Sequence, residues 1–524
     1  MPLITLFSAP KPFTNPHIAM IQRNAIRSWT LLPDVEVILL GEETGLAEAV
    51  SIWISLMPQV ANDLDKVIVK LDSAGTELSK IDANRYPQSF RGVAVRDTIE
   101  SAQRNLSSLS ENAPDIKQAL NTIPKILGVG GVGKRYMIIM QNNKEQRPTG
   151  GFMTNYATFK VRNALLDSDF TSKDMYSIDN TLDIIDKTYD FPDPPVAYTK
   201  YLKVERLYAR DSNYNPDFPL SMDKFLSMYN LAGRISPMEI KPVDGIFAID
   251  TDVISELLNV TGPVTVNGFT YDSNNVVLEL EKLASLALRE QVGRKRVLGY
   301  LMGAMLQNVF ESEKNLWPKL IDKAVDLMLK KHILVYLLDP QAETLVEKYN
   351  LAGRITDPVE GDYDYFVSTN LGGDKTSGFI KKDYEHILSK EDDKWVRTDK
   401  VKYTYIQPSN EWTPFVTVYR DWFRLYVPSG ATLISVDGSE DGSSTEQLSE
   451  RNKTYFTGYM TLAPYDTKEI MIKYYLPATV KIEDIYNLLI QKQPGNSSED
   501  HVVTVNGVSE KVTIDRDYNY SKKL

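Results

Sequence analysis

The chain has 524 residues, of which 42% are hydrophobic and 25% are charged, a globular composition with room for about three domains. The formal net charge of −11 argues against nonspecific binding to nucleic acid. The chain has no Cys, which excludes disulfides, thiol catalysis and Cys-bound zinc. Its four His are far apart in the sequence, no apolar run is long enough to span a membrane, and no signal peptide is evident.

The N-terminal 48 residues predict a strand–helix–strand unit, with strands at 3–8 and 35–41 and a helix at 16–31. This order is typical of α/β folds. The sequences FSAPKPFTNPHIAMIQRNAIRSW and VEVILLGEE resemble the start of nucleotide-sugar glycosyltransferases. The resemblance ends at about residue 45, and the metal-binding Asp-x-Asp element of such enzymes does not follow. We therefore expect residues 1–48 to be a truncated or fused fragment of that domain.

Residues 49–125 are predicted to form a helical hairpin. Apolar residues recur at alternating three- and four-residue spacing over 64–81 and again over 99–113, on either side of a break at Pro87. This spacing is the seam of two amphipathic helices. The expected role of the hairpin is therefore structural packing or a stalk, and not chemistry.

The sequence GVGGVGK at 128–134 fits the phosphate-binding pattern G-x-x-x-x-G-K. Arg135 stands where that loop has Ser or Thr, and the glycines precede a predicted strand instead of following one. We therefore do not expect a nucleotide site at this position.

The segment YMIIMQNNKEQRPTGGF at 136–152 is the most informative part of the chain. Its apolar start predicts a buried strand, which ends in a cluster of amides with Glu145 and Arg147, followed by a sharp turn at 148–151. Glycine lets backbone N–H groups approach a ligand closely, and Arg binds phosphate through two nitrogens. The cluster indicates a site for an anionic ligand, with a polar hairpin that binds no ligand as an equally weighted alternative.

Residues 126–380 predict a mixed α/β domain, because strand-like and helix-like runs alternate along them. A second polar cluster, RDSNYNPDFP, lies at 210–219. Asp250 or Thr251 is expected to cap a helix that ends at Leu258. The other expected elements are a strand at 175–178, a helix at 220–230 capped by Ser221, a strand at 244–250, helical stretches at 277–311 and 316–330, and a strand at 332–338.

Residues 381–524 predict an all-β domain, so the expected fold class is a mixed α/β domain with a helical-hairpin lead-in and a C-terminal β-sandwich. Runs rich in Tyr, Val and Thr alternate with segments of Gly, Pro, Ser and Asp, as in an antiparallel sandwich. Trp412, Tyr419 and Trp422 are expected in its core and not on a sugar-binding platform. The predicted strands are 400–406, 415–418, 423–427, 454–462, 469–475 and 501–508.

Five segments of the chain carry a family resemblance: QNNKEQRPTGGF, RDSNYNPDFP, DGIFAIDTDVISELLNVTGPV, KHILVYLLDP and YRDWFRLYVPSGATL. Together they resemble domain-of-unknown-function family 4012, DUF4012, over roughly residues 60–520. The first two segments are the more specific. This resemblance alone implies no function.

The order of elements is also similar to that of the LytR–CpsA–Psr phosphotransferases, which move a glycopolymer from a polyprenyl-pyrophosphate carrier to the cell wall. The matching parts are the strand end at 141–147, the run at 176–179, the strand, helix and turn at 244–263, and the basic helix at 293–296. Amides stand at most of that family's first Asp and Arg positions, and Asp179-Asn180 replaces its Arg-Asp pair. Its N-terminal membrane anchor is not evident in this sequence.

The resemblance implies transfer of a phosphate-linked glycan. Such a reaction needs arginines and a divalent metal to neutralise the leaving phosphate, and a carboxylate to activate the acceptor hydroxyl. The residues expected to do this are Glu145, Arg147, Arg210 and Asp211, with Mg²⁺ held by Asp211 and Asp217. The expected ligand-binding residues are Gln141, Asn142, Asn143, Thr149, Gly150, Gly151, Asn213, Asp217, Arg294 and Arg296.

The leading functional hypothesis is an extracytoplasmic cell-envelope protein that binds or transfers a polyprenyl-pyrophosphate-linked glycan or cell-wall polymer, at or near the membrane surface. A second hypothesis is a non-catalytic envelope protein, in which the sandwich serves adhesion or assembly. A third is a glycosyltransferase, which depends on residues 1–45 alone.

Overall fold

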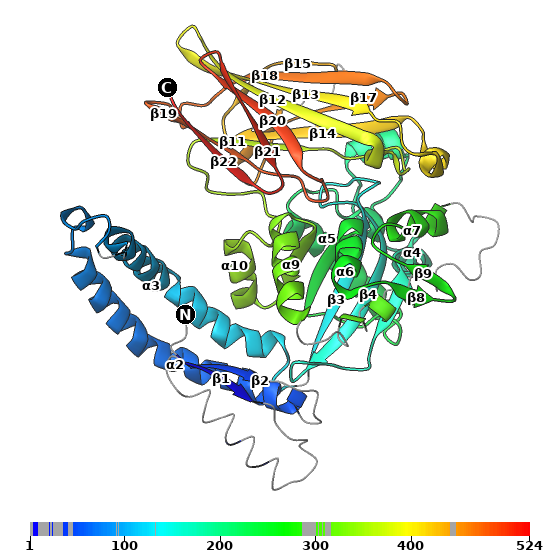
Figure 1. The fold of residues 1–524 in the computed structure, drawn as a ribbon. Coiled ribbons are helices and arrows are strands. Elements are labelled where there is room, and N and C mark those ends of the chain that lie inside the picture. Colours follow the sequence, from blue (N-terminus) through cyan, green and yellow to red (C-terminus); the bar gives the residue numbers. More distant parts are fainter. Residues whose placement is uncertain are drawn as a thin grey trace. The chain divides into compact units, whose positions relative to one another are not determined.

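The computed structural model describes most of the chain (Figure 1). The described residues are 4–8, 35–39, 46–90, 94–131, 133–285, 316–440 and 447–524, with a few isolated positions and short runs between them. They form two compact units. The first comprises residues 1–136, 159–170 and 337–345, and the second comprises residues 137–158, 171–336 and 346–524. The predicted helix at 16–31 lies almost entirely outside the described residues.

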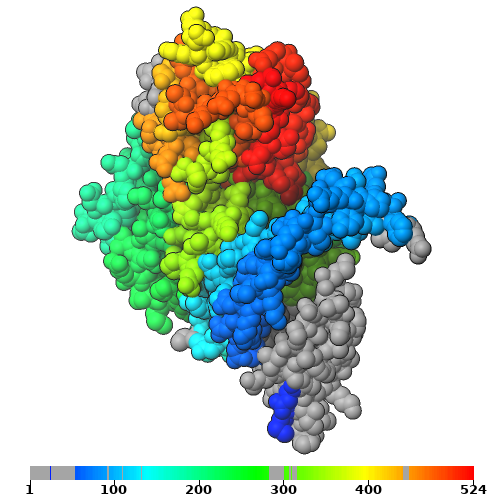
Figure 2. Space-filling model, turned by 90° about the vertical axis from the view of Figure 1, so that its left-hand side faces the viewer, coloured from blue at the N-terminus to red at the C-terminus, as the bar shows by residue number. Residues whose placement is uncertain are grey.

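The first unit contains the predicted helical hairpin, in which α2 spans Leu46–Ser79 and α3 spans Val95–Ile126. Figures 1 and 2 show the two helices lying side by side, in shades of blue. Gln103 Nε2 on α3 donates to the carbonyl oxygens of Leu78 and Ile81, each at 2.9 Å, and joins the helices near their turn. The apolar seam read from the sequence therefore faces a partner helix, as an amphipathic pattern requires.

The two N-terminal strands also belong to the first unit. β1 (Ile4–Ser8) and β2 (Val35–Leu39) pair in parallel, as a strand–helix–strand unit requires. Among the described residues, no helix has both the length and the apolar character needed to cross a membrane.

A mixed α/β part, most of it in the second unit, has a six-stranded sheet in the order β10-β7-β3-β4-β5, with β6 paired to β4. Its strands are β3 (Lys134–Asn142), β4 (Phe152–Arg162), β5 (Leu165–Leu166), β6 (Thr171–Asp174), β7 (Gly245–Asp250) and β10 (Ile333–Leu337). The remaining elements are α4 (Tyr176–Leu182), α5 (Phe218–Ile235), α6 (Thr251–Thr261), β8 (Val264–Val266), β9 (Phe269–Tyr271), α7 (Val276–Ser285), α9 (Trp317–Leu329) and α10 (Pro340–Lys348). Side chains of the sheet and of α5 form its core, among them Met137, Met153, Phe225 and Ile246.

Two local predictions in this part are wrong. The run at 175–178 begins helix α4 and not a strand, because Asp174 Oδ1 accepts a hydrogen bond from Tyr176 N at 2.8 Å and starts a helical turn. Ser221 does not cap α5, since that helix begins earlier, with Asp217 as the cap that accepts from Leu220 N at 3.3 Å. The prediction that Asp250 caps α6 is confirmed.

The β-sandwich completes the second unit and consists of two six-stranded sheets. One sheet has the order β16-β17-β14-β11-β19-β22, with bounds β16 (Gln447–Glu450), β17 (Lys453–Leu462), β14 (Tyr419–Pro428), β11 (Asp362–Val367), β19 (Ile485–Ile490) and β22 (Tyr518–Lys523). The other has the order β15-β18-β13-β12-β20-β21, with bounds β15 (Thr432–Asp437), β18 (Thr467–Tyr475), β13 (Lys394–Tyr405), β12 (Ile380–Glu391), β20 (Glu499–Val505) and β21 (Val508–Ile514). The sandwich thus includes β11, which precedes residue 381.

The sandwich differs from the sequence prediction in its pairing and at two runs. β11 pairs in parallel with β19, and β12 pairs in parallel with β20, so it is not wholly antiparallel. The run at 415–418 is not a strand, because Asn410–Phe415 is a 3₁₀-helix whose last side chain fills the core. The run at 501–508 is divided into β20 and β21 by a turn at Asn506-Gly507, a sequence that favours tight hairpins.

The three aromatic residues expected in the sandwich core have different environments. Tyr419 is fully buried in that core, and Trp412 packs against it. Trp422 lies elsewhere, with its ring centroid 6.1 Å from that of Tyr198 in the α/β part. The expectation is therefore confirmed for two of the three, and Trp422 joins the two parts of the second unit.

Charged groups as well as apolar ones fill the interior of the sandwich. Arg397 is 0% exposed, and its Nη2 donates to Asp399 Oδ1 at 2.7 Å and to Asp364 Oδ2 at 3.3 Å. His386 Nδ1 lies 2.7 Å from the same Asp399 oxygen, and its Nε2 lies 2.9 Å from His501 Nδ1. Burial opposes a charge on His386, but the carboxylates of Asp364 and Asp399 outweigh it and raise the pKa of His386 from 6.5 to about 9.

We expect the free energy of unfolding to depend on pH through His386. Its pKa is higher in the folded protein, so its stabilisation is complete below about pH 6.5 and is lost as the pH rises through about 9. Urea unfolding of wild type and His386→Gln at several pH values should show a difference that shrinks by about 3 kcal/mol across this interval. A difference that stays constant with pH would contradict the prediction.

Candidate functional site

The two polar clusters predicted from the sequence meet in the second unit. Asn213 Nδ2 donates to Thr149 Oγ1 and to Gly151 O, each at 2.9 Å. Thr149 Oγ1 in turn donates to Gln141 Oε1 at 2.9 Å, and Gly151 N donates to the same oxygen at 3.0 Å. A Cβ on Gly151 would lie 2.2 Å from Asn142 O, so only glycine fits this contact. These predicted ligand-binding residues are thus together, as hydrogen-bond partners of one another.

Arg147 and Glu145 form a buried ion pair at the end of β3. Arg147 is 1% exposed, its Nη2 donates to Glu145 Oε1 at 3.0 Å, and its Nη1 donates to Asn370 O. The other Glu145 oxygen accepts from Lys375 Nζ at 3.3 Å. Asn370 and Lys375 come from the sandwich part of the chain, so the predicted catalytic arginine also joins the two parts of the second unit.

Arg210 is the more accessible of the two predicted catalytic arginines, with 18% of its side chain exposed. Its Nη1 donates to Asp179 Oδ2 at 2.8 Å. The guanidinium carbon lies 4.0 Å from the ring centroid of Tyr208 and 4.7 Å from that of Tyr176. A carboxylate and two aromatic rings therefore fix the direction of this guanidinium group.

Asp211 follows Arg210 in a short 3₁₀-helix and is 4% exposed. Burial raises the pKa of Asp211 to about 6, against the opposing effect of the positive charges of Arg147 and Arg210, while Glu145 raises it further. The four residues predicted to be catalytic are therefore electrostatic neighbours, although the two motifs are separated in the sequence.

The loop that follows β3 is held by the sandwich. Asn143 Nδ2 donates to Gly495 O at 3.1 Å, and Gln493 Nε2 donates to Arg147 O at 3.3 Å. Further bonds run from Asn370 N to Gln146 O at 2.9 Å, from Gln146 N to Ser377 Oγ at 3.1 Å, and from Ser377 N to Lys144 O at 3.0 Å. Most polar groups of this loop thus bond to protein partners.

The remaining predicted site residues have other partners, adjoin this cluster or lie outside the described residues. Asp217 is 0% exposed, accepts hydrogen bonds from Leu220 N, Ile355 N and Arg354, and forms an ion pair with Arg451. Asn142 Oδ1 accepts from Lys144 N at 3.0 Å, and Gly150 is buried beside Gln141. Arg294 and Arg296 lie outside the described residues.

Two other groups of side chains have the composition of a metal site, and neither was predicted. Asp250, Asp252 and His332 offer ligand atoms within 4.8 Å of one another, but His332 Nδ1 lies 2.6 Å from Asp250 Oδ2, a hydrogen bond that occupies both atoms. The second group consists of Asp364, His386 and Asp399 in the sandwich core, where Arg397 already donates hydrogen bonds to both carboxylates. No local sequence pattern marks the first group, because His332 is 82 residues from Asp250.

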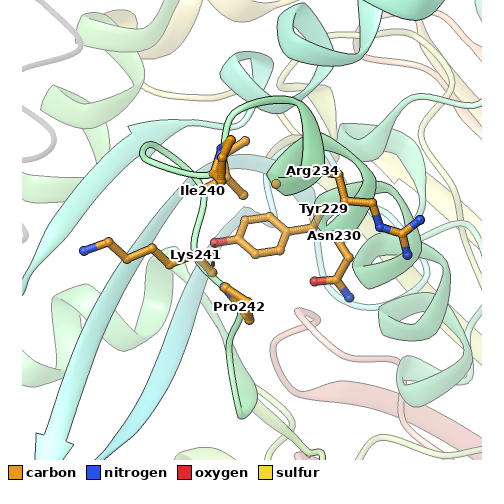
Figure 3. Close-up of a pocket in the computed structure, with 8 residues that line it drawn as sticks. Tyr229, Asn230, Arg234, Ile240, Lys241 and Pro242 are labelled. Carbon is orange, nitrogen blue, oxygen red and sulfur yellow. Dashed lines mark hydrogen bonds between the residues drawn. The ribbon is translucent and has the colours of Figure 1, made fainter.

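A cavity of 380 Å³ lies at the C-terminal end of α5 (Figure 3). It is lined by Tyr229, Asn230, Gly233, Arg234, Pro237, Ile240, Lys241 and Pro242. Tyr229 Oη donates to Lys241 O at 2.9 Å, while the charged ends of Arg234 and Lys241 point away from the Tyr229 ring. None of the predicted site residues lines this cavity, so we do not place the candidate site there.

Both polar clusters fall within one family match. Residues 133–284 match the DUF4012 family, described as a protein of unknown function. This confirms the DUF4012 resemblance for that segment, whereas the resemblance to the LytR–CpsA–Psr phosphotransferases is not shown by any comparison. No match is found among curated proteins.

Among solved structures, this chain is similar to a crystal structure of a candidate nutrient-binding protein from Legionella pneumophila. The identity is 10% and the TM-score is 0.20, over 28% of this chain and 55% of that chain. A similarity at this level carries no argument about fold or function.

We expect the contact between the loop after β3 and the sandwich to leave no room for an added side-chain atom. Gly495 has φ +77°, and a Cβ there would lie 2.4 Å from Gly150 O. Gly507 also has φ +77° but has nothing within 4 Å of such a Cβ. Gly495→Ala should therefore lower the free energy of unfolding by about 2 kcal/mol more than Gly507→Ala, which carries the same backbone cost. Equal losses in urea unfolding would show that the contact relaxes freely.

Proposed function

We propose that this protein binds a glycan carried on polyprenyl pyrophosphate and transfers it to a hydroxyl acceptor at the cell envelope. The observation that supports this proposal is the cluster of Glu145, Arg147, Arg210 and Asp211, in which Asp211 is buried and has a pKa of about 6. The carrier lipid and the envelope location rest on the resemblance to the LytR–CpsA–Psr phosphotransferases.

Arg210 is the group that we expect to contact the pyrophosphate. Its side chain retains 18% exposure, whereas that of Arg147 has 2%. Asp179 and two aromatic rings hold its guanidinium in place, so little conformational freedom would be lost on binding. Arg147 is almost fully buried, so it would act through its positive charge on the groups that bind the ligand.

Asp211 is the candidate general base. At neutral pH it is ionised, and its raised pKa of about 6 makes it a better proton acceptor than an exposed aspartate. In the proposed step it takes the proton of the acceptor hydroxyl, whose oxygen forms a new bond to phosphorus. The bond from that phosphorus to the oxygen of the polyprenyl phosphate breaks, and the leaving group departs with the electron pair.

Mg²⁺ bound by Asp211 and Asp217 stays a prediction, and Asp217 would have to exchange its bonds to two arginines and two backbone N–H groups in order to bind it. Mg²⁺ would supply further neutralisation of the pyrophosphate charge.

A second candidate function is that of a non-catalytic envelope protein. The observation that favours it is the burial of Arg147, which is 1% exposed and hydrogen-bonded to Glu145 and to Asn370 O. In that case the polar cluster would serve only to join the α/β part to the sandwich. No observation on the described residues favours the glycosyltransferase hypothesis beyond the two N-terminal strands.

We expect Arg210→Gln to weaken binding of a short-chain prenyl pyrophosphate at least tenfold in calorimetric titration with Mg²⁺, because a charge-assisted contact is lost. Arg206→Gln is the matched control, since Arg206 also stacks on Tyr208, at 4.3 Å, and pairs with Asp186 at 2.8 Å. Its effect should be about twofold or less. Equal effects of the two substitutions, or no binding by wild type, would favour the non-catalytic alternative.

We also expect a pH dependence of transfer. Since only the ionised form of Asp211 accepts a proton, release of prenyl phosphate should fall to half its plateau as the pH is lowered to about 6. Asp211→Asn should retain prenyl pyrophosphate binding and lose this release. Release by Asp211→Asn at the wild-type rate would exclude Asp211 as the base.

A further inference from the structure

A row of polar side chains leads from the interior of the sandwich to the loop after β3. It includes His386 on β12 and His501 on the parallel strand β20. Each of these residues is 2% exposed, the planes of their rings differ by 9°, and His386 Nε2 lies 2.9 Å from His501 Nδ1. On its other side, His501 Nε2 lies 3.5 Å from Glu499 Oε2. Because the two imidazoles are bonded directly to each other, the protons that they carry are interdependent.

The row continues from Glu499 to the candidate site. Glu499 Oε1 accepts a hydrogen bond from Asn496 Nδ2, and Asn496 Oδ1 accepts one from Gln146 Nε2. Gln146 is the residue before Arg147 in the loop after β3, and it is 4% exposed. The side chain of Gln146 is therefore connected to Glu499 through a single residue.

The neighbours of His386 fix one of its two ring protons. Its Nδ1 lies 2.7 Å from Asp399 Oδ1 and 3.4 Å from Asp364 Oδ2, and ionised carboxylates only accept hydrogen bonds. Nδ1 therefore carries a proton whether or not the ring is charged. The nitrogen that gains or loses a proton is Nε2, which faces His501.

The proton at this position decides what His501 offers to Glu499. When the two rings share one extra proton, His501 Nε2 keeps its N–H and donates it to the Glu499 carboxylate. When that proton is lost, the two rings cannot satisfy both contacts. The buried contact of 2.9 Å between the rings is the stronger, so His501 donates from Nδ1 to His386 and presents a lone pair to Glu499 at 3.5 Å. Two acceptors repel each other, and the bond to Glu499 is lost.

The surrounding charges set the pH at which the proton is held. The carboxylates of Asp364 and Asp399 raise the pKa of His386 to about 9, although burial opposes this. The extra proton is therefore present at neutral pH and is lost as the pH rises through about 9. The other charged or titratable groups that face His386, His501 or Glu499 are Arg397, Tyr384, Lys382 and Lys492.

We propose that His386 and His501 form a proton-dependent switch that sets the partners of Gln146 in the loop beside Arg147. With the extra proton bound, donors and acceptors alternate along the whole row. When the proton is lost, Glu499 gives up one of its partners, and the side chains that link it to Gln146 rearrange. The switch would give the candidate site a dependence on pH. That effect rests on the proposed function, whereas the rearrangement itself depends only on the hydrogen bonds of the row.

The test is NMR of the full chain with 15N-labelled histidine and glutamine, titrated between about pH 7 and about pH 10, with circular dichroism to follow the fold. The chain has four His, so their signals can be assigned by single substitutions. As His386 loses its proton, the protonated nitrogen of His501 should change from Nε2 to Nδ1. The side-chain amide signal of Gln146 should shift with the same midpoint.

Glu499→Gln separates the proton from the loop. Its side-chain oxygen still accepts from Asn496, while its amide N–H donates to a bare His501 Nε2, so that loss of the proton breaks no bond. The midpoint of His386 should fall by about one pH unit or more, and the Gln146 signal should no longer follow it. Glu385→Gln is the matched control, because Glu385 is next to His386 in the sequence but pairs with Lys400 at 2.8 Å, and it should change neither.

An unchanged protonated nitrogen on His501 while His386 titrates would overturn the inference. A Gln146 signal with an unrelated midpoint, or equal effects of the two Glu→Gln substitutions, would overturn it as well. Calorimetric binding of a short-chain prenyl pyrophosphate should weaken over the same pH range in wild type and not in Glu499→Gln. Absence of binding at every pH would count against the proposed function alone, because the NMR signals report the switch without a ligand.

Discussion

The requirement that buried polar groups be hydrogen-bonded governs how the second unit is built. The strand β3 ends in a loop that carries more amides and charges than its own α/β part can satisfy. The sandwich supplies the missing partners. The Arg147 side chain donates to Asn370 O, and the Gln493 side chain donates to the backbone oxygen of Arg147. The α/β part and the sandwich are therefore joined through the most polar segment of the chain, and not only through an apolar contact.

The same arrangement gives the candidate site its rigidity. A catalytic or binding group must be held in one orientation by its neighbours. Here Glu145 and Arg147 are fixed by the sandwich, while Arg210 is fixed within the α/β part by Asp179 and its aromatic neighbours. Asp211 is buried next to Arg210, whose Nε lies 3.6 Å from Asp211 Oδ2. Glu145 and Arg147 thus belong to the candidate site and also join the two parts of the second unit.

Much of the fold was predictable because periodicity is a local property. The seam of α2 and α3 and the strands β3, β4 and β7 follow from spacing alone. The errors arose where a short run was decided by one neighbouring side chain, as at Asp174 and Asp217. The two polar motifs were both predicted to supply residues of the site, and they lie together in the structure. The contacts of Arg147 with Asn370 and Gln493 could not be found from the sequence, since these residues are far from Arg147 along the chain.

The two parallel pairings in the sandwich have a consequence for how the protein is made. β11 and β12 lie in the middle of their sheets, yet each is completed on one side by a strand near the end of the chain, as the pairs Asp362–Leu488 and Asp383–Asp500 illustrate. During synthesis both strands therefore keep an open edge until β19 and β20 have left the ribosome. Open edges pair readily with other chains, and contacts between distant residues form slowly. The nascent protein is accordingly exposed to aggregation during this interval, when a chaperone that covers strand edges would have its greatest effect.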